Sequence, residues 1–442
     1  MSIRGRLLFC FVGLSFGSFL SAADEPTTPV PTASTTSTPG IDTPTNLWDR
    51  ANLLGDSGGW RTSLNDSGWQ PFASWTGEIW DNVGGGIRPG LTDDMILTGG
   101  TEADLEKLAG WTGGTFRVSF NWIQSNHPDH DTGAFNEPSS IDAANQVRLY
   151  NLYLRQKLFD SQLTLKVGQI GMDDDFVQST AAAFFINPGV NLQPILVNQV
   201  LANGNPSIPH FPLDAPGLFV RMDPKGCPVY TQAAVYLSDA GADVSNNHGL
   251  GWHPGHGLIY AAETGWNYQW AAKPGTVAAG AYYNDGKFTN WDTGAGQRGI
   301  WGVYGYINQI LYQAKGTGSG DPQPILTAFL TCGVAGPDNL VGPNCDCACG
   351  INWCGLLPSR PQDVAGVAVL YTGFSSAYTR SAFNSNGPGI STAAETNLEF
   401  TYQINVTPWV SVQPDFHLAF NPANAGSRST ALILGLRAAV TF

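Results

Sequence analysis

Three closely spaced histidines form the first candidate for a chemical site in this sequence. His248, His253 and His256 lie in the glycine-rich stretch NNHGLGWHPGHG, and neighbouring imidazoles can hold a transition metal. The stretch offers no evident carboxylate partner and no regular element that would fix the rings. We therefore interpret it as a surface loop and predict no metal site.

Three consecutive carboxylates form the second candidate. Asp173, Asp174 and Asp175 lie in GMDDDFVQSTAAAFFINPG, within a long segment between Gly168 and Leu218. Connections of this length usually serve a function or are disordered. If the segment folds into a channel, the three carboxylates could line the narrowest point of the channel and discourage anions. The alternative is that they form an exposed acidic turn or cap the N-terminus of a helix. Paired acids in a recognisable catalytic motif are missing, so we predict no enzyme activity and no cofactor.

The elements that position these residues are predicted to be β-strands, because apolar and polar residues alternate along much of the chain. In ALILGLRAAVTF, residues 431–442, Leu434 and Leu436 share one face and Arg437 lies on the other, which is the period of a strand. In a soluble sandwich the apolar face forms the core, whereas in an outer-membrane barrel it faces lipid and the polar face lines a wet lumen. Strands that run longer than the usual five or six residues favour the barrel.

Composition agrees with a barrel. The 442 residues include 13% charged residues, 11% aromatic residues and 53 glycines, which suits many turns and girdles of aromatic side chains. The chain carries 35 acidic and 21 basic residues, a net charge of −14, which argues against nucleic acid as a partner. Beyond residue 23 the sequence has no apolar stretch of about 18 residues. In a membrane, the chain would therefore have to form a closed barrel.

Four segments are predicted along the chain. Residues 1–23 have the basic start, apolar stretch and small-residue end of a cleaved signal peptide, which indicates export. Residues 24–46 are rich in proline and threonine and are expected to be a disordered tether. Residues 47–70 should contain a short helix over about 59–65, capped by Asp56. Residues 71–442 should form a barrel of about 16 strands, with short turns such as LFDSQ, MDPKGCP and NVTPW at one end and long loops at the other.

The sequence resembles the carbohydrate-selective porins of the OprB type. The matching stretches are NLLGDSGGWRTSL, DLEKLAGWTGGTF, RLYNLYLRQKLFDSQLTLKVGQIGMDDDF, GLLPSRPQDVAGVAV, ETNLEFTYQINVTPWVSVQPDFH and ALILGLRAAVTF. They occur in the family's order and cover most of the chain after residue 46. The resemblance implies a 16-stranded outer-membrane barrel of a Gram-negative-type bacterium, with the N-terminal helix within or beneath it and a lumen that admits sugars. It also implies that Phe442 resembles the terminal aromatic signal read by the barrel-assembly machinery. A homotrimer is one option, although no stripe of residues marks an interface.

Strand parity selects the side chains that should face the lumen. A sugar-selective pore needs polar groups that replace part of the solute's hydration and bind it weakly enough to release it. The pore-lining candidates are Arg117, Ser119, Asn121, Glu399, Thr401, Gln403, Gln413, Asp415, His417 and Arg437. For each of them we prefer the simpler interpretation of a polar wall position that is wetted by water and only tunes the pore.

Six cysteines lie outside the predicted signal peptide. Cys345, Cys347 and Cys349 share one face of a strand, so bridges among them would be strained. Cross-strand pairing with Cys332 is open, and we interpret most of the cysteines as small apolar residues on the lipid face. The spacing is not that of a zinc site.

The functional hypothesis is passive diffusion of small hydrophilic solutes, with carbohydrates such as monosaccharides preferred. A general porin without sugar selectivity, or a barrel gated by its N-terminal segment, is the main alternative. A secreted all-β carbohydrate-binding protein or enzyme would show the same alternation in a two-layered fold. The expected partners are outer-membrane lipid, the assembly machinery and small sugars.

Overall fold

The protein was analysed as a computed structural model that describes residues 46–192, 208–239, 241, 244–314, 324–386, 393–423 and 429–442. The predicted signal peptide and nearly all of the predicted tether lie outside the described residues. In the described part of the chain, no helix has the length and apolar character needed to cross a membrane.

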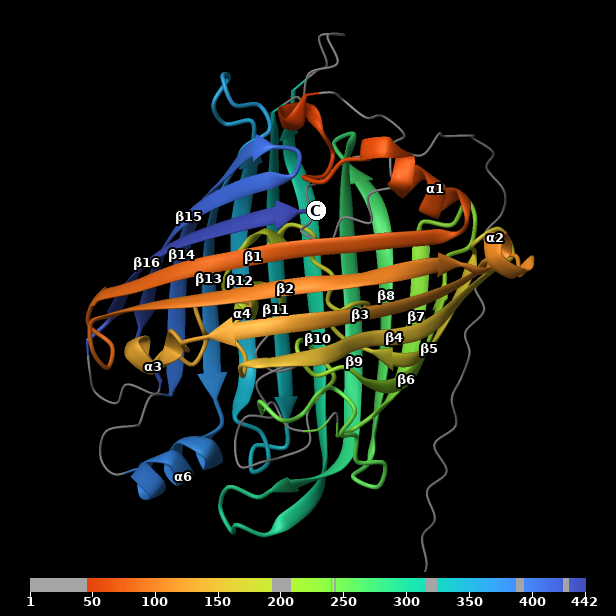
Figure 1. Ribbon diagram of the computed structural model, residues 1–442. Helices are drawn as coiled ribbons and strands as arrows, with labels where there is room; N and C mark the ends of the chain where they lie inside the picture. Colours follow the sequence, from red (N-terminus) through yellow and green to blue (C-terminus); the bar gives the residue numbers. More distant parts are fainter. Residues whose placement is uncertain are drawn as a thin grey trace, which may run out of the picture. The chain divides into compact units, whose positions relative to one another are not determined.

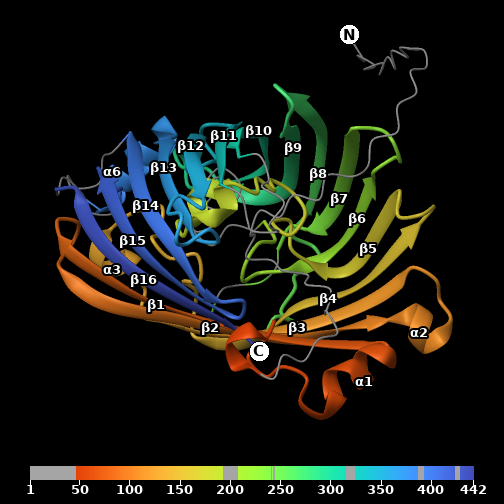
Figure 2. The ribbon, with the colours of Figure 1, turned by 90° about the horizontal axis from the view of Figure 1, so that it is seen from above.

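Sixteen antiparallel strands form one closed barrel (Figures 1 and 2). Each strand pairs with its neighbours in sequence, and the first strand pairs with the last from Ser74 opposite Thr441 onward. This closure confirms the predicted all-β transmembrane barrel with 16 strands. The strands are β1 (Trp69–Gly84), β2 (Gly90–Asp104), β3 (Gly114–Ser125), β4 (Gln146–Leu158), β5 (Leu163–Ile170), β6 (Ala215–Met222), β7 (Val229–Leu237), β8 (Leu258–Trp270), β9 (Lys273–Thr289), β10 (Gly296–Gln313), β11 (Ile325–Gly336), β12 (Pro343–Cys354), β13 (Val364–Phe374), β14 (Ala394–Thr407), β15 (Val410–Phe420) and β16 (Ala431–Thr441).

The apolar face of the strands points away from the barrel interior. On β16, Leu434 and Leu436 are 46% and 45% exposed, whereas Ile433, which has the opposite parity and faces inward, is 1% exposed. A soluble sandwich would bury such leucines against a second sheet. Here all sixteen strands belong to the same closed wall, so the sandwich alternative is wrong.

A row of aromatic side chains crosses three neighbouring strands on the outer face. Tyr283 on β9 lies opposite Tyr260 on β8 and Trp301 on β10, and all three are between 43% and 47% exposed. Amphipathic rings at one level of an outer wall are typical of the girdles that meet the membrane interface. The row therefore marks one boundary of the apolar band.

The two ends of the barrel differ in their connections. At the end that holds the C-terminus, residues 159–162, 223–228 and 408–409 make short connections, as predicted, and residues 271–272 make a further short turn that was not predicted. The opposite end carries the longer connections 126–145, 171–214 and 238–257. The short helices are η1 (Leu47–Asp49), η2 (Ser57–Gly59), α1 (Trp60–Asp66), α2 (Leu105–Ala109), α3 (Asp129–Thr132), η3 (Ala182–Phe184), α4 (Pro188–Leu192) and α6 (Ser376–Asn386).

The N-terminal helix α1 lies beside β1 at the end of the barrel that holds the C-terminus (Figure 1). It begins within one residue of the predicted position, and the Asp56 carboxylate accepts a hydrogen bond from the Arg61 backbone N–H at 2.7 Å. The Arg61 guanidinium donates to the Phe442 carbonyl at 3.0 Å, and the Phe442 N–H donates to the Ala73 carbonyl at 3.0 Å. These contacts join helix α1 and the last residue to the seam between β1 and β16, and no residue of α1 is buried.

Candidate functional site

The first part of the connection between β5 and β6, residues 171–192, enters the barrel and follows its inner wall (Figure 2). The backbone N–H of Val177 donates to the Glu263 carboxylate on β8 at 3.0 Å. Further along, the Asn352 amide on β12 donates to the Ala181 carbonyl at 2.7 Å. A loop inside a barrel lacks the partners of regular secondary structure, so polar wall side chains satisfy its backbone.

The same loop is held most firmly at Glu399 on β14. One oxygen of this carboxylate accepts from Ile186 N–H at 2.7 Å, and the other accepts from Asn187 N–H at 3.2 Å. On β15, the Gln413 amide donates to the Phe184 carbonyl at 3.3 Å. The inner loop is therefore attached to strands β8, β12, β14 and β15, all of which lie in the half of the wall that runs from β8 to β15.

Aromatic packing fills the space between the loop and the wall. Phe184 and Phe185 lie against the wall, and the Phe185 ring is 5.5 Å from that of Phe329 on β11. A Cβ atom on Gly366 of β13 would lie 2.6 Å from the Phe184 ring, so only glycine leaves room for it. Small wall residues thus let the loop approach closely, because packed interiors tolerate few overlaps.

The acidic triplet lies at the start of this loop. The Asp173 carboxylate accepts from Phe211 N–H at 2.9 Å, and Asp175 pairs with Lys166 of β5 at 2.7 Å. The Asp174 carboxylate accepts a hydrogen bond from the Asn151 amide at 3.2 Å, and part of Asp174 stays exposed. Desolvation by the surrounding protein, helped by the charges of its two neighbours, raises the pKa of Asp174 to about 7. The triplet is therefore inside the barrel, and its predicted role as a constriction stays a prediction.

Basic side chains face the triplet from strands β3 to β5. Arg117 and Arg155 both contact the Glu102 carboxylate of β2, at 2.6 Å and 3.5 Å. Arg155 lies directly opposite Lys166 across the β4–β5 pair. Each of these three cationic side chains is between 13% and 22% exposed. The positive wall beside the acidic loop is therefore only partly covered.

Aromatic rings accompany the cations on the same face. The Arg117 guanidinium lies 4.4 Å from the Phe72 ring centre, and that of Arg221 on β6 lies 3.9 Å from the Tyr230 ring centre. Such stacking holds the planar guanidinium in place while its edge N–H groups stay available. We call Phe72, Glu102, Arg117, Arg155, Lys166, Arg221 and Tyr230 the charged wall.

The predicted pore-lining residues share the inward parity of their strands, but they fall into two groups. Arg117 and Arg437 are partly exposed, and the Arg437 guanidinium contacts Glu78 and the Ser140 hydroxyl. Gln403 also shares this parity and is half-buried. The remaining members are at most 5% exposed, because inner loops and neighbouring side chains cover them: Ser119, Asn121, Glu399, Thr401, Gln413, Asp415 and His417. Direct contact of any of these residues with a passing solute stays a prediction.

Sequence reasoning missed the acceptors that hold the inner loops. Glu263 receives hydrogen bonds from the Tyr230 and Tyr304 hydroxyls, both at 2.9 Å, in addition to the loop. Glu395 on β14 likewise accepts from Phe135 N–H at 2.7 Å, in the connection 126–145. A signal existed, since an acid at an inward position of a strand needs a partner. The partner itself could not be predicted because it comes from a distant part of the chain.

The cysteines lie mainly on the outer face. Cys332 on β11 and Cys347 on β12 face each other in register and form a disulfide. Cys349 is exposed on the same side as Ile351, which is 43% exposed to the outside. The cross-strand pairing that the sequence left open is therefore present.

Comparisons with known proteins place this barrel in a family. The model of the family described as "Carbohydrate-selective porin, OprB family" matches residues 88–442. Porin B of Pseudomonas aeruginosa is 24% identical over 435 residues, which cover 90% of this chain and 92% of that protein. The putative porin QuiX of Acinetobacter baylyi is 29% identical over 142 residues, 30% of this chain and 32% of that protein.

Solved structures agree on the fold. The high-pH structure of Pseudomonas putida OprB has a TM-score of 0.78 at 20% identity, covering 89% of this chain and 99% of that one. The low-pH structure of the same porin has a TM-score of 0.56 at 18% identity with the same coverage. The closed 16-stranded wall, its outward apolar face and the family match over most of the chain lead to one conclusion. The chain belongs to the OprB family of carbohydrate-selective porins and is an outer-membrane channel of a Gram-negative bacterium.

Proposed function

We propose that this outer-membrane sugar porin passes monosaccharide-sized carbohydrates along the charged wall. The observation that carries the proposal is the stacking of Arg117 on Phe72 and of Arg221 on Tyr230. Arginine N–H groups can donate to sugar hydroxyls and the Glu102 carboxylate can accept from them. Aromatic faces nearby suit the apolar faces of a sugar ring. Each contact with the wall replaces a hydrogen bond between the sugar and water. The net binding free energy is therefore small, so the sugar can enter the channel and can also leave it.

The two sides of the lumen serve different purposes in this proposal. The inward polar residues on β14 and β15 are covered by the inner loop, so they hold the loop and do not line the passage. The charged wall keeps side-chain exposure of up to 33% at Arg221. Water and solute therefore pass on the side of β2 to β6.

The acidic triplet supplies the charge filter in this proposal. Asp173, Asp174 and Asp175 lie across from Arg117 and Lys166, so cations and anions each meet one favourable and one unfavourable surface. A neutral sugar is not penalised by either charge. The arrangement thus favours neutral polar solutes over ions of either sign.

The remaining assignments are proposals as well. Residues 1–23 are a cleaved signal, 24–46 a tether, 47–70 an N-terminal helical segment beneath the barrel, and 71–442 the barrel that contacts lipid. Phe442 is proposed as the signal for the assembly machinery on the family resemblance alone, and its N–H continues the pairing onto β1 at Ala73. A homotrimer is also proposed, and its only ground is that porins often form trimers.

Planar bilayers test the transport proposal. Single-channel current is recorded while glucose, a disaccharide or a small anion is added. Sugar that enters the charged wall displaces ions, so we expect glucose to lower the current and the double variant Arg117→Ala/Arg155→Ala to weaken this block. A sugar-insensitive current would leave a general porin. Recordings without residues 24–69 test gating by the N-terminal segment, and an unchanged current would exclude it.

A further inference from the structure

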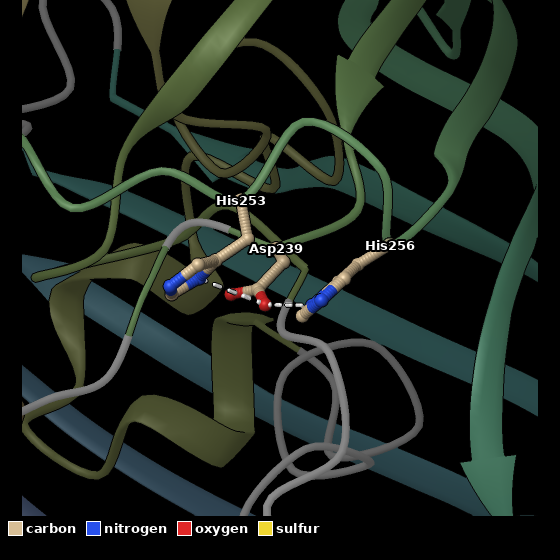
Figure 3. Close-up of side chains that lie close together, drawn as sticks. All are labelled: Asp239, His253 and His256. Carbon is tan, nitrogen blue, oxygen red and sulfur yellow. Dashed lines mark hydrogen bonds and ion pairs between the residues drawn. The ribbon is translucent and has the colours of Figure 1, made fainter.

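The connection between β7 and β8 brings one carboxylate and two imidazoles together (Figure 3). The Asp239 Oδ2 atom lies 2.6 Å from His256 Nδ1 and 3.1 Å from His253 Nδ1. Asp239 is the second residue after β7, and the histidines lie shortly before β8. Residues from the two ends of a 20-residue connection are therefore joined at one oxygen atom.

The backbone positions Asp239 for this contact. The Ser238 N–H donates to the Gly257 carbonyl at 2.9 Å, which closes the base of the loop. Gly257 has a φ of +118°, a conformation that favours glycine. The Gly241 N–H donates to Asp239 Oδ1 at 2.8 Å. One carboxylate oxygen is thus fixed by the backbone, and the other is directed to the imidazoles.

A tight turn pairs the two histidines. The sequence His253-Pro254-Gly255-His256 folds back on itself, with the Gly255 and His256 N–H groups directed to the His253 carbonyl at 2.9 and 3.3 Å. The rings stack with centres 5.2 Å apart and an angle of 16° between their planes. Both rings therefore present Nδ1 toward the same carboxylate.

The third histidine of the sequence motif is used differently. His248 Nδ1 lies 2.8 Å from the Val147 carbonyl of β4, and the Leu149 N–H donates to the His248 carbonyl at 3.0 Å. His248 therefore docks the loop on β4. The sequence argued against a metal because the histidines had no carboxylate partner, and the fold supplies that partner as Asp239.

We propose that Asp239, His253 and His256 bind a late first-row divalent transition metal ion, with Zn²⁺ as the probe. Two imidazole nitrogens and one carboxylate oxygen are a donor set that such ions prefer. Donor atoms around tetrahedral zinc are about 3.4 Å apart, given bond lengths of 2.0–2.2 Å. The observed separations of 2.6 and 3.1 Å need only a small outward rotation of exposed rings. Water completes the coordination, since both histidines are more than half exposed.

The ion would cross-link the two ends of the connection between β7 and β8. It would join the residue after Ser238 to the residue before Gly257, where a hydrogen bond already closes the loop. Because His248 anchors the middle of the loop on β4, a bound ion would fix the whole connection against the barrel rim. This role is independent of sugar transport and does not rest on it.

Calorimetric titration of the refolded, detergent-solubilised protein without a polyhistidine tag tests the proposal. We expect one Zn²⁺ bound per chain at Asp239, His253 and His256. The variant His253→Ala/His256→Ala should bind Zn²⁺ at least ~100-fold more weakly, since loss of even a supporting partner costs up to that factor. His248→Ala is the matched control and should bind as the unchanged protein does.

Two results would overturn the site. The first is Zn²⁺ binding that persists in the double variant, which would place the ion elsewhere, for example at His127 and Asp142, which lie 2.7 Å apart. The second is the absence of saturable binding by the unchanged protein. Heat-modifiable gel mobility reports whether each variant has folded. If the double variant fails to fold, Asp239→Asn, which keeps the side-chain shape, provides the same comparison, and the Co²⁺ absorption spectrum identifies imidazole ligands directly.

Discussion

Replacing Glu399 by alanine should release the inner loop from the wall. The carboxylate is 1% exposed and accepts two backbone hydrogen bonds, from Ile186 at 2.7 Å and Asn187 at 3.2 Å. Leaving a buried N–H group unsatisfied costs about 1–3 kcal/mol, so the loss of both acceptor oxygens costs about 2–6 kcal/mol. The change also removes an acidic group beside Asp415, which offsets part of the loss.

We therefore take a value in the lower half of the range for the net effect. A loss of about 3 kcal/mol shifts the equilibrium between the attached and released loop by about 100-fold, because each 1.4 kcal/mol corresponds to a factor of ten. A loop that leaves the wall intermittently should make the single-channel current flicker between levels. Glu399→Gln keeps one acceptor oxygen and should give a smaller effect.

Planar-bilayer recording measures this effect directly. Glu106→Ala, on the exposed helix α2, is the matched control that removes a carboxylate away from the loop and should leave the current steady. Heat-modifiable mobility verifies that each barrel has folded. If folded Glu399→Ala showed the conductance and current noise of the unchanged protein, the two hydrogen bonds would not hold the loop, and the reasoning would be refuted.

Three further predictions concern other parts of the barrel. Because desolvation raises the pKa of Asp174 to about 7, its carboxyl is neutralised as the pH falls below that value, so reversal potentials in a KCl gradient should show declining cation preference from pH 8 to pH 5; a pH dependence that survives in Asp174→Asn would contradict this. Arg61→Ala removes the hydrogen bond to the Phe442 carbonyl and should destabilise the seam by about 1 kcal/mol, seen as a lower temperature for the heat-modifiable shift. Cys332→Ser removes the bridge to Cys347, and a bridge with a separation of 15 residues contributes about 3 kcal/mol to stability. The temperature of the heat-modifiable shift should therefore fall in this variant, and by the same amount when a reductant is added to the unchanged protein. A variant as stable as the oxidised unchanged protein would argue against the bridge.

The wall of the barrel could be predicted from the sequence because its signal is local. Side chains of a strand alternate between two faces, so the outward position of Leu434 and Phe400 and the inward position of Glu399 follow from neighbouring residues alone. Long strands and the resemblance to a porin family then decided that the outward face meets lipid. Arg155 and Lys166 were not among the predicted pore-lining residues, and their position opposite each other across β4 and β5 follows only from the strand register.

The contents of the lumen could not be predicted in this way. Parity correctly directed Glu399 inward, yet the sequence suggested water as its partner, whereas the structure places Ile186 and Asn187 there.

The sequence by itself therefore indicated a β-barrel of the porin type, the face of strands such as β14 and β16 that meets lipid, and the position of short turns such as LFDSQ. Only the tertiary structure decided which side of the lumen is filled by loop backbone and which keeps exposed charge, and that Asp239 meets His253 and His256. The reason is physical: alternation is set by adjacent residues, whereas closing the barrel brings together residues that are tens to hundreds of positions apart, and their contacts depend on the register of every strand between them.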